Sequence, residues 1–146
     1  MAMSSLRAPA ARDSAGVDAA LLILRVVLGV MILIHGLSKL PPPPDFVIGV
    51  LAKANLPAVL AYGVYVGEIV APILLIVGVW SRLAAVVIAI NMIAAVVLVN
   101  LPSLFKLNEY GGYALELDAM YLFTAVALAL TGAGRFSVGG RYGPMN

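Results

Sequence analysis

A chain of 146 residues with 63% hydrophobic and 11% charged residues is too apolar for a soluble domain, which has roughly 45–50% apolar and about 25% charged residues. The net charge of +2 is too small and too dispersed for a nucleic-acid-binding protein. The absence of cysteine excludes disulfides and thiol redox chemistry by this chain, and a single histidine, His35, argues against a metal site within one chain. We therefore expect an all-α membrane protein.

Four stretches are apolar enough to cross a bilayer, since each crossing needs roughly 20 residues. They are expected at residues 19–40, 57–79, 83–101 and 113–131. Four prolines, residues 41–44, end the first stretch, and residues 45–55 have the pattern of an amphipathic helix at the membrane surface. The predicted fold is a four-transmembrane-helix bundle over residues 19–132, with a short interfacial helix between spans one and two.

The basic residues predict the orientation of the bundle, because cytoplasmic loops carry an excess of lysine and arginine. The segments that flank the spans on one side contain Arg7, Arg12, Arg82, Arg135 and Arg141, whereas the opposite loops contain only Lys53 and Lys106. We expect residues 1–18 and 133–146 to be cytoplasmic tails of a multi-pass protein of the cell membrane. A cleaved signal peptide is disfavoured, because the first apolar stretch is too long and no small-residue cleavage site follows it.

Polar residues inside the spans form one candidate layer. Glu68 lies midway along span two, where an unpaired charge costs several kcal/mol, with the amount disputed. Asn91 lies midway along span three, which runs in the opposite direction. Arg25 lies about two turns into span one, and we expect its long side chain to reach Glu68. The alternative is that this layer is only structural: an ion pair that fixes the register, and an asparagine that joins helices.

A second candidate layer lies nearer the outer face. His35 and Lys39 lie near the end of span one, on the same arc as Arg25 at about 100° per residue. Glu116 and Asp118 lie at the start of span four on nearly opposite sides, so at most one faces the interior, and Glu116 is the candidate. His35 suits proton transfer. The alternatives are that His35 packs and that Lys39 extends to the outer surface.

Three motifs in order resemble the DoxX family of small four-helix membrane proteins. They are Leu24-Arg25-Val26-Val27-Leu28-Gly29 leading to His35-Gly36-Leu37-Ser38-Lys39-Leu40, then Gly67-Glu68-Ile69 leading to Ser81-Arg82-Leu83-Ala84-Ala85, then Gly111-Gly112-Tyr113 with Glu116 leading to the segment from Leu130 to Ser137. The resemblance covers residues 20–140. After Ser137 the family often has Asp, where this chain has Val138. The resemblance implies a cytoplasmic-membrane protein associated with membrane oxidoreductase assemblies, and a related branch with a thiosulfate:quinone oxidoreductase.

The leading functional hypothesis is a DoxX-type membrane subunit that supports an oxidoreductase partner, more an accessory than a complete enzyme. A quinone-like or other amphipathic molecule is the expected ligand, since bundle cores are where such sites are built. The candidate residues of this chain for ligand binding or proton relay are Arg25, His35, Lys39, Glu68, Asn91 and Glu116. The alternatives are a non-enzymatic scaffold, whose polar layers only specify packing, and a small proton-coupled transporter that uses Glu68. Lipid is an expected partner, nucleic acid is not, and self-association is left open.

Overall fold

The computed structural model describes residues 11–140 and 142–146, with side chains from residue 15 onward. The first element, α1 (Ala11–Leu37), begins before the predicted start of span one at residue 19. Residues 11–18, expected in a tail, therefore belong to a helix, while the rest of that tail lies outside the described residues. The helix ends ahead of the four prolines, as expected from their inability to continue a helix.

The polyproline segment leads into α2 (Asp45–Lys53), close to the helix predicted at residues 45–55. A second long helical stretch follows and changes its winding along its length. It consists of a 3₁₀ turn η1 (Ala58–Tyr62), α3 (Gly63–Tyr65), a π-helical segment η2 (Val66–Val70) and α4 (Ala71–Val77). Gly78 ends the stretch in the left-handed conformation, with φ of +79°, which glycine adopts at little cost.

The third long stretch has the same mixed character. It consists of α5 (Ser81–Ala95), a second π-helical segment η3 (Val96–Asn100) and a short 3₁₀ turn η4 (Leu101–Ser103) that contains Pro102. A loop with an isolated antiparallel bridge between Leu107 and Tyr113 leads to α6 (Glu116–Thr131). Each π-helical segment inserts extra backbone into the helix, a feature often found at functional sites.

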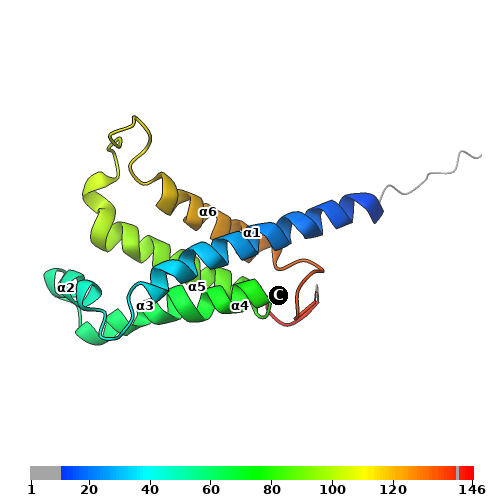
Figure 1. Ribbon diagram of the computed structural model, residues 1–146, viewed down its shortest axis with the longest axis horizontal. Helices are drawn as coiled ribbons and strands as arrows, with labels where there is room; N and C mark the ends of the chain where they lie inside the picture. The colour runs from blue at the N-terminus through cyan, green and yellow to red at the C-terminus, as the bar shows by residue number, and fades with distance from the viewer. Residues whose placement is uncertain (1–10, 141) are drawn as a thin grey trace, which may run out of the picture.

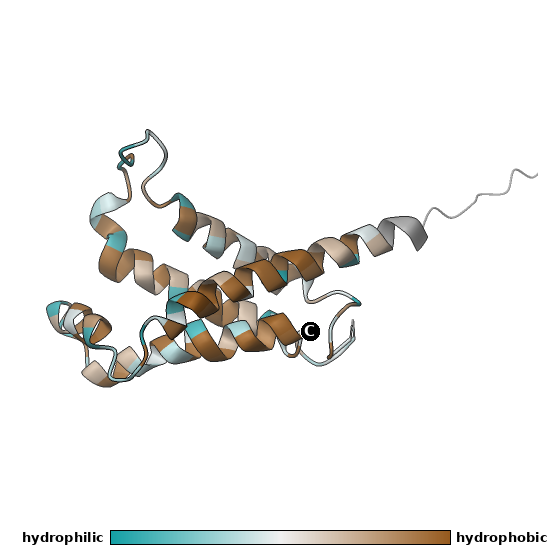
Figure 2. Ribbon diagram, in the orientation of Figure 1, coloured by the Kyte–Doolittle hydropathy of each residue, from teal (hydrophilic) through white to brown (hydrophobic). Residues whose placement is uncertain are grey.

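Three helical stretches are long and apolar enough to cross a membrane: 15–37, 58–77 and 81–103. The predicted fourth span is shorter than these, because α6 has 16 residues, or roughly 24 Å of helix at 1.5 Å per residue. Figure 2 shows that apolar residues predominate along the long helices. Among the described residues the fold is all-helical apart from the isolated bridge, which agrees with a helical membrane protein.

The helices pack side by side, with α4 and α6 both against α1 and with α5 between α4 and α6 (Figure 1). Small residues permit this close packing. Gly29 of α1 lies against Pro72 and Ile76, and Gly36 lies against the backbone of Glu68. The shared core is formed by Leu28, Ile32, Ala71, Leu75, Ala84, Ala85, Ile88, Ala89, Met92, Ala125 and Leu128.

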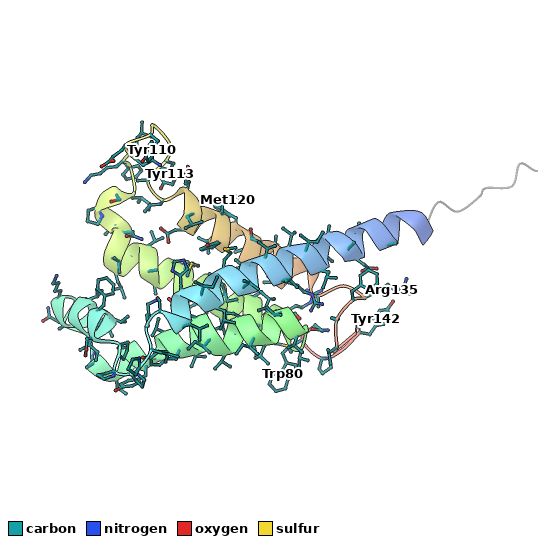
Figure 3. The ribbon with its side chains drawn as sticks, viewed as in Figure 1. Trp80, Tyr110, Tyr113, Met120, Arg135 and Tyr142 are labelled. Carbon is teal, nitrogen blue, oxygen red and sulfur yellow. The ribbon has the colours of Figure 1, made fainter. Side chains whose placement is uncertain are left out.

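The bundle has two unlike ends (Figure 1). We call one the tail end, formed by the first half of α1, the turn at residues 78–80 and residues 132–140 and 142–146. We call the other the cavity end, formed by the C-terminal part of α1 together with α2, η1 and η3. Exposed aromatic residues lie at both: Trp80 and Tyr142 at the tail end, Tyr110 and Tyr113 at the cavity end (Figure 3).

Candidate functional site

A cavity of about 650 Å³ opens at the cavity end, within the range of ligand pockets, roughly 300–1,000 Å³. Most of its wall is apolar. The apolar residues come from α2, from the stretch 60–67, from α5 with η3, and from Leu117 of α6. The polar side chains that line it are His35, Lys39, Glu68, Asn91, Asn100, Asp118 and Tyr121. The cavity is therefore an apolar chamber with a small number of hydrogen-bonding groups.

Glu68 is the most deeply buried of these polar residues, with 6% of its surface exposed. It lies in η2 and forms an ion pair with Lys39 through Oε2. The side-chain amide of Asn91 donates a hydrogen bond to Oε1 at 3.3 Å. The Tyr65 hydroxyl donates to the backbone oxygen of Lys39 at 3.0 Å and so fixes the turn that carries the lysine. Both carboxylate oxygens of Glu68 thus have partners. We call Glu68, Lys39 and Asn91 the triad, and all three side chains line the cavity.

Two glycines allow the triad to assemble. A Cβ on Gly36 would collide with the Glu68 carbonyl, so glycine lets α1 approach the backbone of η2. A Cβ on Gly67 would lie 2.7 Å from Cγ of Asn91, so glycine makes room for the asparagine of α5. The two glycines therefore allow the Glu68 carboxylate to lie between α1 and α5.

A second group of polar side chains lies where α6 meets η3. Asn100 donates a side-chain hydrogen bond to Oδ2 of Asp118 at 3.1 Å. One turn farther along α6, the ring of Tyr121 makes an edge contact with His35, with 6.2 Å between the ring centroids. The cavity wall therefore carries polar groups from α1, η2, α5, η3 and α6.

The structure corrects the predicted contact between Arg25 and Glu68. Arg25 donates instead to two backbone oxygens, those of Leu75 at 3.4 Å and of Phe136. The antiparallel packing explains the difference, because Glu68 lies level with Gly36, eleven residues or roughly 16 Å along α1 from Arg25. In addition, side chains on a helix lean toward its N-terminus, which directs Arg25 away from the cavity.

The structure also decides which acidic residue of α6 faces the cavity. Asp118 lines it, whereas Glu116 is exposed and lies beside Gly112 in the preceding loop. The choice of Glu116 as a cavity residue was therefore wrong. Sequence periodicity places the two carboxylates on opposite sides of one helix, but only the rotation of α6 in the bundle determines which side faces inward.

Sequence reasoning missed Asn100 as a cavity residue. Nine residues separate it from Asn91, and at about 100° per residue they would point to opposite sides of a regular α-helix. The π-helical η3, with hydrogen bonds from i to i+5, turns less per residue and brings Asn100 back toward the cavity. The sequence of η3 contains no residue that predicts this change of winding; it reads Val96-Val97-Leu98-Val99-Asn100.

Other buried polar residues lie at the tail end and bond mainly to backbone groups. Asp18 lies within α1 and accepts a hydrogen bond from the backbone N–H of Arg135 at 3.0 Å. Asn146 accepts hydrogen bonds from the backbone N–H and the hydroxyl of Ser81. Arg82, which is exposed, donates to the carbonyls of Leu130 and Thr131 that end α6. Within the segment expected to form a tail, Arg135, Phe136 and Asn146 therefore bond to the bundle.

The triad at the cavity can bind a polar group without a large electrostatic cost. Lys39 neutralises Glu68, and its ammonium keeps donors beyond the one used in the ion pair. Asn91 likewise has a second amide N–H and an oxygen available for hydrogen bonding. The arrangement can therefore hold a neutral head group by hydrogen bonds.

Comparison with known proteins identifies the family. The DoxX family model matches residues 20–101. A protein of Bacillus subtilis (strain 168) named "Putative oxidoreductase CatD" is 32% identical over 112 residues, which cover 77% of this chain and 78% of the relative. No solved structure matches the chain. The chain is therefore a membrane protein that belongs to the DoxX family.

Proposed function

We propose that this chain is a membrane subunit that supports an oxidoreductase system by binding an amphipathic, quinone-like molecule in the cavity beside Glu68. The observation that carries the proposal is the apolar cavity of about 650 Å³ with a hydrogen-bonding triad in its wall. A quinone has an apolar body and polar carbonyls. Lys39 and Asn91 would donate to a carbonyl, and the apolar lining would cover the rest of the molecule.

The residues that carry the site support the role of a subunit rather than that of a complete enzyme. The chain contains no cysteine, so it has no thiol for a dithiol step. The side chains at the cavity can move protons and form hydrogen bonds, while electrons would come from a partner protein. The name of the relative, an oxidoreductase, agrees with such an assembly.

In the proposed topology α6 is the fourth crossing of the cell membrane and both termini are cytoplasmic. Although α6 is short, it packs along α5, and residues on either side of it would complete the crossing. Arg82 and Arg135 lie at the tail end, and Lys53 and Lys106 lie toward the other end. The excess of arginine, together with Arg7, Arg12 and Arg141 in the sequence, favours a cytoplasmic tail end. The cavity would then face the outer half of the membrane.

Ligand content and ligand affinity test this proposal. The full chain is purified in a mild detergent, its lipid extract is analysed for quinones by mass spectrometry, and decylubiquinone binding is measured by native mass spectrometry. We expect co-purified quinone and saturable binding that Glu68→Gln weakens at least tenfold, since the neutral amide no longer holds Lys39 in place. The matched control is Glu116→Gln, the same change on an exposed carboxylate outside the cavity. Absence of saturable binding by the wild-type chain would overturn the proposal.

One observation favours a scaffold function as the second candidate. Both oxygens of Glu68 already have protein partners, so the triad needs no ligand to satisfy it. A scaffold predicts that Glu68→Gln lowers stability or partner association while no amphiphile binds at all. The binding experiment with the two matched variants separates the two functions.

A further inference from the structure

The charges on the cavity wall do not cancel. Three lining side chains carry a formal charge, namely Lys39, Glu68 and Asp118. Lys39 is paired with Glu68. Asp118 is left with the neutral amide of Asn100 as its hydrogen-bond partner, at 3.1 Å. Among the lining residues that the structure describes, Lys39 is the one with a permanent positive charge.

We propose that Asp118 restricts the cavity to amphiphiles without a negative charge. The ligand is then a lipid-like molecule with a neutral or cationic head group, and not a fatty acid or an acidic phospholipid. This inference rests on the proposed function, because it assumes that the cavity binds an amphiphile. It adds the class of head group and names the residue that selects it.

An anionic head group has no favourable position in this wall. Beside Asp118 it meets a like charge in apolar surroundings, where charges interact more strongly than in water. Beside Lys39 it can accept a hydrogen bond from a remaining donor, but Glu68 already balances the charge of Lys39, so the anion adds an uncompensated negative charge to a mostly apolar wall. Both positions therefore disfavour an anion.

Neutral and cationic head groups meet no such obstacle. A neutral head can accept hydrogen bonds from the remaining donors of Lys39, Asn91 and Asn100. A cationic head can pair with Oδ1 of Asp118, since the hydrogen bond from Asn100 uses Oδ2. The ring of His35, in edge contact with Tyr121, lies in the same wall.

Matched probes with one chain length and three head charges test the inference. The probes are dodecyltrimethylammonium, 1-dodecanol and laurate, and their apparent Kd values are measured by native mass spectrometry on the full chain. The experiment is run at low salt and about pH 8, where a free imidazole is neutral. We expect laurate to bind at least tenfold more weakly than 1-dodecanol, and dodecyltrimethylammonium to bind at least as tightly as 1-dodecanol.

Two variants remove the negative charge by different routes. Asp118→Asn deletes it, and Asn100→Lys places a cation beside it, so either should bring laurate within about threefold of 1-dodecanol. Asp45→Asn is the control, because Asp45 is exposed and outside the cavity. Equal binding of laurate and 1-dodecanol by the wild-type chain would overturn the inference and leave the proposed function standing. Failure of all three probes, and of decylubiquinone, to bind would instead overturn the proposed function.

Discussion

The two ends of the bundle use buried polar residues in different ways. At the tail end, Arg25 and Asp18 bond to backbone groups of the segment that follows α6. At the cavity end, Glu68 bonds to the side chains of Lys39 and Asn91, and all three face an apolar chamber. Backbone groups are fixed partners, whereas side chains with spare donors can also bind a ligand. A charge in an apolar helix therefore indicates burial, and its partners distinguish a structural role from a functional one.

The largest effect should come from removing the arginine of the tail end. Arg25→Ala leaves the carbonyls of Leu75 and Phe136 without their charged donor, and we expect a loss of about 3 kcal/mol in the free energy of unfolding. Folded Arg25→Ala should bind decylubiquinone with unchanged affinity, because Arg25 does not line the cavity. Unfolding in mixed micelles and ligand titration measure the two quantities. The control is Arg135→Ala, because this exposed arginine contributes its backbone N–H and not its side chain. A tenfold change in the Kd of decylubiquinone in Arg25→Ala would contradict the division of roles between the two ends.

The second effect concerns the close approach of α1 to η2. The added methyl of Gly36→Ala collides with the Glu68 carbonyl, and overpacking of this kind costs about 2 kcal/mol. Because the collision moves the backbone of Glu68, ligand affinity should fall together with stability. Gly49→Ala is the matched control: nothing lies within 4 Å of its new methyl, and alanine favours the helix. Equal stability of the two variants would show that α1 and η2 do not pack as described.

A double-mutant cycle measures the ion pair of the cavity end. Lys39→Met and Glu68→Gln should each destabilise the chain, while the double variant should lose less than the sum, with a coupling of about 1 kcal/mol. The coupling is modest because Lys39 is partly exposed, with 24% of its side chain accessible. Lys39→Met combined with Glu116→Gln should be additive. Additivity in the first cycle would show that Lys39 and Glu68 do not interact in solution.

The smallest effect is expected at Glu116. Its side chain is exposed and outside the cavity, so Glu116→Gln should change the free energy of unfolding by less than about 0.5 kcal/mol. Thermal unfolding monitored by circular dichroism is sufficient to measure it. A tenfold loss of ligand affinity in this variant would show that Glu116 belongs to the site.

Much of the fold could be predicted from the sequence, because long apolar stretches and prolines act locally. The three long helices, the helix at residues 45–53 and the stop at residues 41–44 follow from hydropathy and from the geometry of proline. The start of α1 at Ala11 was missed, since polar and alanine-rich residues give no clear boundary. The fourth crossing, expected at residues 113–131, contains α6 and stays a prediction, because α6 is shorter than the other three stretches.

The site was only partly predictable, for reasons of register. The contact of Glu68 with Asn91 followed from matching their depths in antiparallel spans, and the structure confirms that contact. The prediction that Arg25 pairs with Glu68 was wrong. It estimated the depth of each residue from its position in its span, whereas the packing of the helices places Glu68 level with Gly36. Lys39 was recognised as a polar residue but not as the partner of Glu68. The winding of η3, which directs Asn100 into the cavity, has no local sequence signal.

Photo-cross-linking with an azido-quinone, followed by peptide mass spectrometry, tests most directly whether the cavity holds an amphipathic ligand. The account predicts labelling of residues in the cavity wall, such as Val87, Ala94 and Leu98, and protection of these sites by excess decylubiquinone. Ile23 and Val77, which are exposed on the outer surface, should gain only label that decylubiquinone does not displace. Labelling confined to the outer surface, with none that decylubiquinone displaces from the cavity wall, would contradict the central claim.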